Sequence, residues 1–384
     1  MTRVLHLSSG NLYGGIETLL TTLAGERALC PEMVPEYGLC FEGRLSSELR
    51  TAGVGLHVVG KVRFSRPWTV WFARRRVRQL LAEIRPDVVV THACWPHSVF
   101  ALAVRDAGLP LVFWAHDVAN MSHWLDRKAA RIPPDFVIAN SNYTASTLHR
   151  LFPGVPHAVV YSPVRRAPGD TGRRADLRRE FDTAADDVVL LAASRLEPWK
   201  GHALLLEALT QLRDRRGWTC WIAGGAQRPH EVEYLGELKR QVEAGNISGR
   251  VRWLGERSDV PDLLAAADVF CQTNQRPEPF GIIFIEAMHA GRPIASVRLG
   301  GAAEIIDNTC GRLAEPGSTT SIARTLSELI ESSQLRHSLG EAGPTRARDL
   351  CDTAVQLSAL HERLRRVSAA AIPESTGSSN GDLR

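Results

Sequence analysis

The sequence predicts an α/β protein made of two Rossmann-like domains, each a doubly wound parallel sheet. A chain of 384 residues is too long for one comfortable core. Short apolar runs alternate with helical segments in both halves, which is the rhythm of parallel β/α folds. A stretch rich in Pro, Gly and Arg separates the halves. The predicted ranges are 1–164 for the first domain, 165–176 for the linker and 177–351 for the second domain.

The composition excludes several classes of protein. The net charge of +4 is mild for this length and does not indicate nucleic-acid binding. The seven cysteines form no C-x-x-C pair, so they predict reduced thiols, with neither disulfides nor a zinc site. There is no signal-peptide pattern, and no apolar run reaches the roughly 18 residues of a membrane span. We therefore expect a soluble cytoplasmic protein.

The first domain opens with a strand at 3–9, a glycine loop at 10–15 and a helix at 16–29. This order brings backbone N–H groups close to a phosphate. The loop is not G-x-G-x-x-G, and no acidic residue is placed for a dinucleotide ribose. On the motif alone, a purely structural turn stays open. Further buried strands are predicted at 53–60, 86–92 and 109–116, and one more ends near Ala139.

Residues 61–78 combine aromatic and basic side chains in one predicted helix and its lead-in. The residues concerned are Lys61, Arg63, Arg66, Trp68, Trp71, Phe72, Arg74, Arg75, Arg76 and Arg78. An amphipathic helix of this kind can lie on an anionic membrane surface. The alternative is an ordinary solvated helix that covers the sheet with its apolar side.

The second domain starts with a strand at 187–194, followed by Arg195 and Lys200 in a loop. Two cations at a strand end are costly to leave unpaired in a cleft, but they are well suited to a diphosphate. Fixed cations stabilise the charge that builds on a leaving phosphate. The alternative is a pair of surface cations near Glu197.

The rest of the second domain continues the same pattern, with strands predicted at 219–223, 251–254, 267–271 and 293–297. Glycine turns are expected at 300–301 and 311–317. The helix at 353–367 should fold back on the first domain. From 369 to 384 the chain is rich in Ser, Gly and Asn, which predicts disorder.

The most informative stretch, 268–291, predicts a strand, a rigid loop and a helix that ends at Gly291. Glu278 ends the loop, and Glu286 lies inside the helix. Eight helical residues span roughly 12 Å, whereas a glycosidase pair needs about 5–9.5 Å. The spacing instead suits two carboxylates that grip hydroxyls at the ends of one long polar ligand. The alternative is a loop carboxylate and a solvated helix position.

Glu278-Pro-Phe-Gly281, followed by Glu286-Ala-Met-His-Ala-Gly291-Arg-Pro293, resembles the E-x7-E region of retaining GT4 glycosyltransferases with the GT-B fold. The likeness runs along most of the chain. It implies metal-independent transfer of a hexose from a nucleotide diphosphate sugar, with UDP ahead of GDP. The implied acceptor is a hydroxyl of a glycan, a glycolipid or a small natural product, and no cofactor is expected beyond this co-substrate.

The resemblance also assigns roles to individual residues. The implied catalytic residues are His116, Glu278, Arg195 and Lys200. The implied donor-binding residues are Gly14, Gly15, Arg195, Lys200, Leu254, Glu278, Phe280, Gly281, Ile282, Glu286 and Gly301. Glu278 would hold the hydroxyls of the donor sugar, and Glu286 the ribose. On the acceptor side we expect His92 and Ser141. For His116, which follows a strand, the alternative is a hydrogen-bonded core histidine.

Two features qualify the resemblance. Asn274 replaces a serine that many relatives have, and the lead-in Gln275-Arg-Pro-Glu278 is less common. No D-x-D sequence is present, so a metal-bound diphosphate is not expected, and Arg195 and Lys200 would replace the metal.

Rival interpretations are an epimerase or phosphorylase of the same fold and a catalytically silent nucleotide-sugar-binding subunit. Peripheral contact with the inner membrane face through 61–78 stays open.

Overall fold

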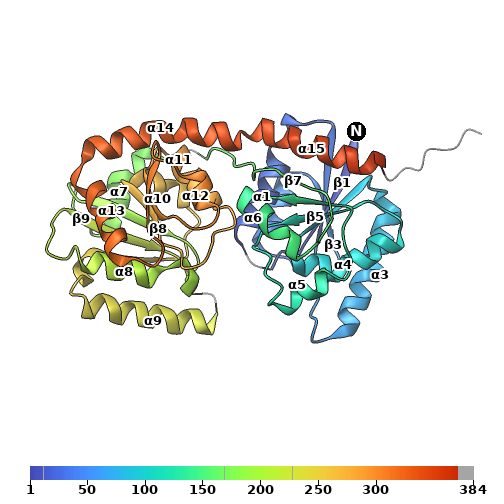
Figure 1. The fold of residues 1–384 in the computed structure, drawn as a ribbon, viewed down its shortest axis with the longest axis horizontal. Helices are drawn as coiled ribbons and strands as arrows, with labels where there is room; N and C mark the ends of the chain where they lie inside the picture. Colours follow the sequence, from blue (N-terminus) through green and yellow to red (C-terminus); the bar gives the residue numbers. More distant parts are fainter. Residues whose placement is uncertain (12, 168, 227, 371–384) are drawn as a thin grey trace, which may run out of the picture.

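The computed structural model describes residues 1–11, 13–167, 169–226 and 228–370. Two α/β domains lie side by side, and the helices α14 (Ser333–Cys351) and α15 (Thr353–Ala370) run in succession along one side of both (Figure 1). Each domain contains one parallel sheet with helices around it. The predicted fold class is confirmed.

The first sheet has seven parallel strands in the order β3-β2-β1-β4-β5-β6-β7. They are β1 (Thr2–Ser8), β2 (Met33–Leu39), β3 (Gly55–Val58), β4 (Val88–His92), β5 (Leu111–Ala115), β6 (Phe136–Ala139) and β7 (His157–Val159). The sequence did not predict β2 or β7. Within β2, Pro35 and Gly38 are residues that normally argue against a strand. Gly38 is needed there, because a Cβ at this position would lie 2.6 Å from the side chain of Leu7.

The helices of the first domain are α1 (Gly15–Gly25), α2 (Arg44–Thr51), α3 (Pro67–Ile84), α4 (Cys94–Asp106), α5 (Trp124–Ala129) and α6 (Asn142–Thr147). The helix expected at 16–29 is shorter than predicted. It ends at Gly25, and a separate 3₁₀ turn covers Arg27–Leu29.

The second sheet has six parallel strands in the order β10-β9-β8-β11-β12-β13. They are β8 (Val188–Ala193), β9 (Trp218–Ala223), β10 (Val251–Gly255), β11 (Val269–Gln272), β12 (Ile294–Val297) and β13 (Gly311–Ala314). The last of these was predicted as a turn and is a strand. Its Gly311 allows close approach to β12, since a Cβ there would lie 2.5 Å from the carbonyl oxygen of Ile294.

The helices of the second domain are α7 (Arg174–Glu180), α8 (His202–Thr210), α9 (Pro229–Ala244), α10 (Val260–Ala266), α11 (Ile282–His289), α12 (Ala302–Ile305) and α13 (Thr319–Glu331). The predicted linker is therefore partly helical, because a 3₁₀ turn covers Thr171–Arg173 and α7 follows it. Two arginines of the predicted linker are paired. Arg173 bonds Asp262, and Arg174 lies 2.6 Å from Asp268.

The helix α15 packs back on the first domain, as predicted. Leu357, Leu360 and Leu364 are fully buried in the first domain's core, together with residues of β1, β2 and α1. Residues 369 and 370 still belong to α15, and the rest of the tail predicted to be disordered lies outside the described residues.

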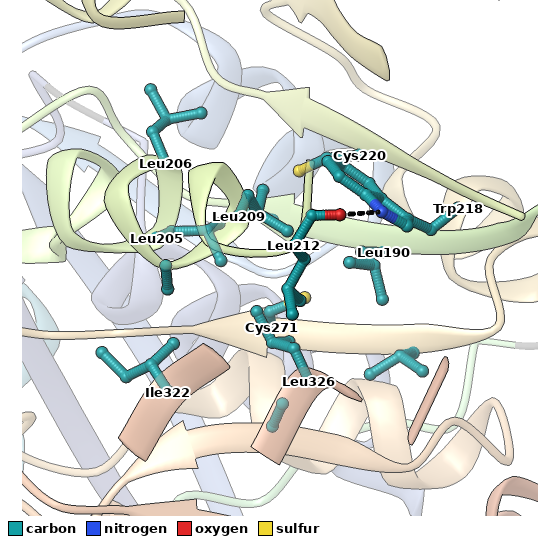
Figure 2. Packing of buried hydrophobic residues seen from close by; sticks show 14 of the residues in the cluster. Leu190, Leu205, Leu206, Leu209, Leu212, Trp218, Cys220, Cys271, Ile322 and Leu326 are labelled. Atoms are coloured by element: carbon teal, nitrogen blue, oxygen red, sulfur yellow. Dashed lines mark hydrogen bonds between the residues drawn. The ribbon is translucent and has the colours of Figure 1, made fainter. Parts of the chain in front are cut away.

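The core of the second domain holds the sheet rigidly beneath the candidate site. Figure 2 shows Leu209 of α8 beside Cys220 and Trp218 of β9, in the same buried cluster as Leu205 and Ile322. The indole N–H of Trp218 donates to the carbonyl oxygen of Leu212 at 3.2 Å. The loop that joins β8 to α8 carries Arg195 and Lys200.

All seven cysteines are free thiols, as predicted. Within the described ranges, none of the helices has the length and apolar character needed to cross a membrane. Cys30, Glu32 and His361 place possible metal-ligating atoms within 4.8 Å of one another. This group joins the β1–β2 connection to α15 and includes none of the predicted site residues.

Candidate functional site

The predicted site residues gather at the carboxyl ends of parallel strands, where ligands bind in such folds. Arg195 and Lys200 follow β8, Glu278 follows β11, and His116 follows β5. Gly14 and Gly15 begin α1 after β1. The two sheets thus contribute side chains and helix N-termini from several loops.

Three side chains hold Glu278 through one of its carboxylate oxygens. Its Oε2 accepts hydrogen bonds from Lys200 Nζ at 2.8 Å, Gln272 Nε2 at 2.9 Å and Asn274 Nδ2 at 2.7 Å. Asn274 and Gln272 are buried, and Glu278 is 8% exposed. No hydrogen bond to the other oxygen, Oε1, is found among the described residues. The carboxylate is therefore fixed in orientation with one oxygen left for a ligand.

Asn274, the departure noted in the sequence, acts as a donor to Glu278. Gln272 was not predicted as a site residue. It is the one polar residue of β11, the last position of an otherwise apolar strand, and this was the signal that could have identified it.

The backbone of Glu278 is fixed by the turn before α12. Glu278 and Gly300 form a parallel bridge, and the Gly301 N–H donates to the carbonyl oxygen of Glu278 at 2.7 Å. Gly300 has φ +69°, and a Cβ there would lie 2.5 Å from that same oxygen. Gly300 is therefore required by both conformation and space. Gly301, predicted to bind the donor, has a visible structural role in supporting this loop.

Two helix N-termini face each other between the domains. Gly14 caps α1 and Gly281 caps α11, and neither cap is satisfied by a side chain. A Cβ built on Gly15 would lie 3.7 Å from Cδ1 of Ile282, which also packs on the first domain's core. The first N–H groups of a helix have no partner within it, so the N-terminus of α11 favours an anion. At α1 the Glu17 carboxylate already accepts from the backbone N–H groups of Glu17 and Gly14.

The two predicted cations are paired with carboxylates in the ligand-free protein. Arg195 Nη1 lies 2.9 Å from Glu197 Oε1, and the Arg195 side chain is partly exposed. Lys200 bonds Glu278 and lies over the Trp199 ring at 4.0 Å. Burial raises the pKa of Glu17 in the first turn of α1. Hydrogen bonds from the backbone N–H groups of Glu17 and Gly14, and then the positive charge of Arg195, oppose that rise.

Glu286 lies on α11 in an apolar setting. Burial raises the pKa of its carboxyl group from 4.5 to about 7. The side chain has no hydrogen-bond partner within the described part of the chain. Two neutral donors from a ligand would satisfy it. A desolvated carboxylate of this kind is suited to the paired hydroxyls of a ligand.

The structure does not bring His92 or Ser141 to a surface that an acceptor could reach. His92 is 1% exposed and lies between His6 and His116. Ser141 is fully buried, where it accepts from the Thr144 N–H and donates to the carbonyl oxygen of Pro279. Both side chains are thus used inside the protein, and their place on the acceptor side stays a prediction. His116 is half-buried.

The remaining predicted residues lie near these elements. Leu254 is half-buried near the end of β10, beside Gly255, whose carbonyl oxygen accepts from the Gly224 N–H. Phe280 is buried, and its ring lies 6.0 Å from that of Tyr161 in the first domain. The sequence identified their positions, and their roles stay predictions.

Glu304 of α12 makes a domain contact that the sequence did not predict. Its carboxylate accepts from the backbone N–H groups of Asn142 and Tyr143 at 3.1 and 3.2 Å, and from the Tyr161 hydroxyl. It therefore joins the second domain to the N-terminus of α6 in the first. Its partners are more than 140 residues away in sequence, so no local pattern indicated them.

Two family models match the chain. The model for glycosyl transferases group 1 matches residues 173–346, and the model for glycosyltransferase family 4 matches residues 13–167. Together they cover both domains.

Curated relatives match over parts of their length. The lipopolysaccharide core biosynthesis glycosyltransferase LpsE of Rhizobium meliloti is 30% identical over 43% of this chain and 46% of its own. The mannosyltransferase LpsB of the same organism is 29% identical over 63% of this chain and 62% of its own. The chain thus spans about half to two thirds of the length of these relatives.

A solved structure matches over the full length. Anabaena Alr3699/HepE in complex with UDP-glucose is 26% identical, has a TM-score of 0.84, and is aligned over 95% of this chain and 100% of that chain. The lipopolysaccharide glycosyltransferase WaaG, at 18% identity and a TM-score of 0.68, supports the fold alone.

Proposed function

This chain belongs to glycosyltransferase family 4 and has the GT-B fold, and from this membership we propose that it is a retaining hexosyltransferase. It moves a hexose from a nucleotide diphosphate sugar to an acceptor hydroxyl. The acceptor is a glycan, a glycolipid or a small natural product. The proposal includes metal independence, with Arg195 and Lys200 in the place of a divalent cation.

The observation that carries the proposal is the geometry around Glu278. One carboxylate oxygen is saturated by Lys200, Gln272 and Asn274, and the other is left for a sugar hydroxyl. Three residues further along the chain, Gly281 caps α11, whose N-terminus favours phosphate. A sugar-binding carboxylate next to a phosphate-binding helix end matches the order of groups in a nucleotide sugar.

The proposed reaction forms one bond and breaks one bond on the same face of the sugar. The acceptor oxygen bonds the anomeric carbon, the bond from that carbon to the phosphate oxygen breaks, and the acceptor proton passes to the leaving phosphate. Negative charge builds on that phosphate. Arg195, Lys200 and the N-terminus of α11 stabilise it. Because the phosphate takes the proton, no protein base is needed.

The relatives support UDP ahead of GDP as the nucleotide. The Anabaena protein that aligns along the whole chain is in complex with UDP-glucose. A Mycobacterium tuberculosis relative, 29% identical over 70% of this chain, is described as a GDP-mannose-dependent mannosyltransferase. Both kinds of donor therefore belong in the first test.

We also propose peripheral contact with the inner membrane face through residues 61–78. Trp68, Trp71 and Phe72 of α3 are 59%, 55% and 60% exposed. Arg75 and Arg76 beside them are exposed as well. Aromatic and basic residues together on one helix favour an anionic lipid surface, which would bring the site close to a lipid-linked acceptor.

The test is a thermal-shift series with UDP-, GDP- and ADP-hexoses in EDTA, followed by transfer assays and NMR of the product's anomeric configuration. A ligand that binds only the folded state raises the melting temperature. A shift with one donor and a product of retained configuration support the proposal. Inverted product overturns retention, and loss of binding in EDTA overturns metal independence. Binding without transfer to any acceptor indicates a silent subunit, and acceptor-independent conversion of the donor indicates an epimerase or phosphorylase.

A further inference from the structure

Three histidines from three neighbouring strands form a hydrogen-bonded chain that ends at the candidate site. His6 lies in β1, His92 is the last residue of β4, and His116 follows β5. His6 Nδ1 lies 3.0 Å from His92 Nε2, and His92 Nδ1 lies 2.9 Å from His116 Nε2. Each contact therefore joins the Nδ1 of one ring to the Nε2 of the next.

The surroundings keep all three rings neutral. His6 stacks on Tyr37 with centroids 5.5 Å apart, and Trp114 stacks on both His92 and His116. Burial lowers the pKa of His6 and of His116 to about 3, and it lowers the pKa of His92 well below its usual value. A neutral imidazole has one N–H donor and one acceptor nitrogen. The two hydrogen bonds between the three histidines must therefore have the same donor-to-acceptor direction.

The buried end of the chain decides that direction. Within the described residues, His6 Nε2 is buried and has no hydrogen-bond partner. In folded proteins a buried N–H without a partner is rarer than an under-satisfied acceptor. The proton of His6 is thus on Nδ1 and is donated to His92. His92 in turn donates from Nδ1 to His116.

We propose that His6 and His92 are positioning residues that hold His116 as the tautomer protonated on Nδ1. His116 then acts as a fixed neutral hydrogen-bond donor to an oxygen of the bound nucleotide sugar. Nδ1 of His116 makes no hydrogen bond within the described protein. It is also not one of the fully buried side-chain atoms that lack a partner. The contact with the sugar donor rests on the proposed function, but the tautomer does not.

This tautomer excludes one role for His116. Nδ1 already carries a proton, and Nε2 is occupied by the N–H of His92. His116 has no free acceptor nitrogen, so it cannot remove the proton of the acceptor hydroxyl. The orientation of the chain thus agrees with transfer of that proton to the leaving phosphate.

The direct test is nitrogen-15 NMR of the full-length protein, labelled in histidine and studied without ligand at neutral pH. The ring signals of His116 are assigned by their loss in His116→Gln. We expect Nδ1 of His116 to be the protonated nitrogen. We also expect a scalar coupling between Nε2 of His116 and Nδ1 of His92 across their hydrogen bond. Protonation of Nε2 would reverse the chain and overturn the proposal. This result is independent of whether the protein transfers hexose.

Two variants of His92 separate positioning from packing. The amide of His92→Gln can accept from His6 and donate to His116, whereas His92→Phe can do neither. With Phe, we expect a mixture of His116 tautomers and a loss of kcat/KM of about tenfold, the scale of one hydrogen bond, with UDP affinity unchanged. With Gln, most of this loss should be restored.

The matched control is His97→Gln. His97 is also fully buried and is hydrogen-bonded to Thr91 and to the carbonyl oxygen of Ile132. It is not part of the row of hydrogen bonds formed by His6, His92 and His116. It should lower the melting temperature and leave both the His116 signals and the kinetics unchanged. If His92→Phe also leaves the His116 signals unchanged, His92 does not set the tautomer and the proposal fails.

Discussion

Lys200 Nζ lies 2.8 Å from Glu278 Oε2, and both side chains are largely withdrawn from solvent, at 13% and 10% exposure. Removing one partner of a buried ion pair leaves the other charge uncompensated. The pair therefore links the geometry of the site to the stability of the second domain. It also fixes the orientation of the Glu278 carboxylate.

The first prediction concerns Glu278→Gln. The amide loses the charge that receives sugar hydroxyls, so transfer should fall on the order of 10²-fold, the scale of one fixed electrostatic contact in a transition state. The affinity for UDP should change little, because phosphate contacts come from other groups. Steady-state kinetics and calorimetric titration with UDP measure the two effects.

Lys200→Met is the companion variant. It removes the cation and leaves Gln272 and Asn274 bonded to Glu278. UDP affinity itself should fall here. Equal losses of UDP affinity in Glu278→Gln and Lys200→Met would contradict the separate roles of the two residues. The melting temperature of each variant shows whether the fold is retained.

The stretch from β11 to α11 was predictable because its signals are local. Pro277 and Pro279 exclude regular structure from the loop, and Gly291 has φ +68° just past the helix end. Glu278 and Glu286 could therefore be placed on loop and helix correctly. The family motif then supplied expected roles that spacing alone did not.

Other parts of the site depend on contacts between distant residues. Glu304 bonds Tyr161 across 143 positions, and His92 bonds His6 across 86 positions. No periodicity records such a contact, so neither the contact of Glu304 nor the hydrogen bonds of His92 could be predicted. The strand β2 was missed for another reason, since Pro35 and Gly38 lower its β propensity while tertiary packing holds it.

The second prediction is a pH dependence caused by Glu286. Its pKa in the ligand-free fold is raised to about 7 by burial. Hydroxyls of a bound ribose would donate to the ionised form and lower this pKa. Binding of UDP near pH 7 should then release protons, and affinity should rise between about pH 6 and pH 8. Calorimetry in buffers of different ionisation enthalpy measures the release.

The Glu286→Gln variant is the control, because the nucleotide's own titration is the same for both proteins. It should bind UDP more weakly and lose the part of the pH dependence that Glu286 causes. The sign for stability is opposite. The fold binds more protons than the unfolded chain between about pH 4.5 and pH 7, so the ligand-free wild type should lose stability relative to Glu286→Gln as pH rises. A pH dependence that is identical in both proteins would refute the assignment.

The third prediction concerns the domain contact at Glu304. Glu304→Ala removes the acceptor for Tyr161 and for the N–H groups of Asn142 and Tyr143. We expect transfer to fall about tenfold, the worth of one or two hydrogen bonds, with UDP affinity retained. Small-angle X-ray scattering should show a larger radius of gyration, because the domains are held less firmly.

Glu341→Ala is a matched control for Glu304→Ala. Glu341 is an exposed carboxylate of α14 that pairs with His337 on the same helix. Its removal should affect neither transfer nor scattering. An unchanged radius of gyration and full activity in Glu304→Ala would show that this contact does not hold the domains together.

The fourth prediction tests membrane contact through α3. Wild-type protein should float with vesicles that contain phosphatidylglycerol, and less so with phosphatidylcholine alone or in high salt. Trp71→Ser with Phe72→Ser should abolish flotation, because both rings are more than half exposed. Val232→Ser, which changes an equally exposed residue of α9, should float like the wild type. Wild-type protein that stays with the unbound fraction would refute the proposal.

The fifth prediction compares two glycines with nearly the same backbone conformation. Gly300 has φ +69° and Gly317 has φ +73°. An alanine in this region costs about 1–2 kcal/mol at either position. At Gly317 the new Cβ meets nothing within 4 Å, whereas at Gly300 it would lie 2.5 Å from the carbonyl oxygen and 2.6 Å from the nitrogen of Glu278.

Gly317→Ala should therefore lower the melting temperature slightly and keep full activity. Gly300→Ala must displace the backbone of Glu278, so it should lose transfer as severely as Glu278→Gln, together with a larger drop in melting temperature. Both quantities are measured on the same preparations. If Gly300→Ala keeps full activity, the loop has room to relax, and the fixed backbone of Glu278 is not what orients its carboxylate. If it loses activity while Gly317→Ala does not, the loss comes from contact with Glu278, because the conformational cost is common to both.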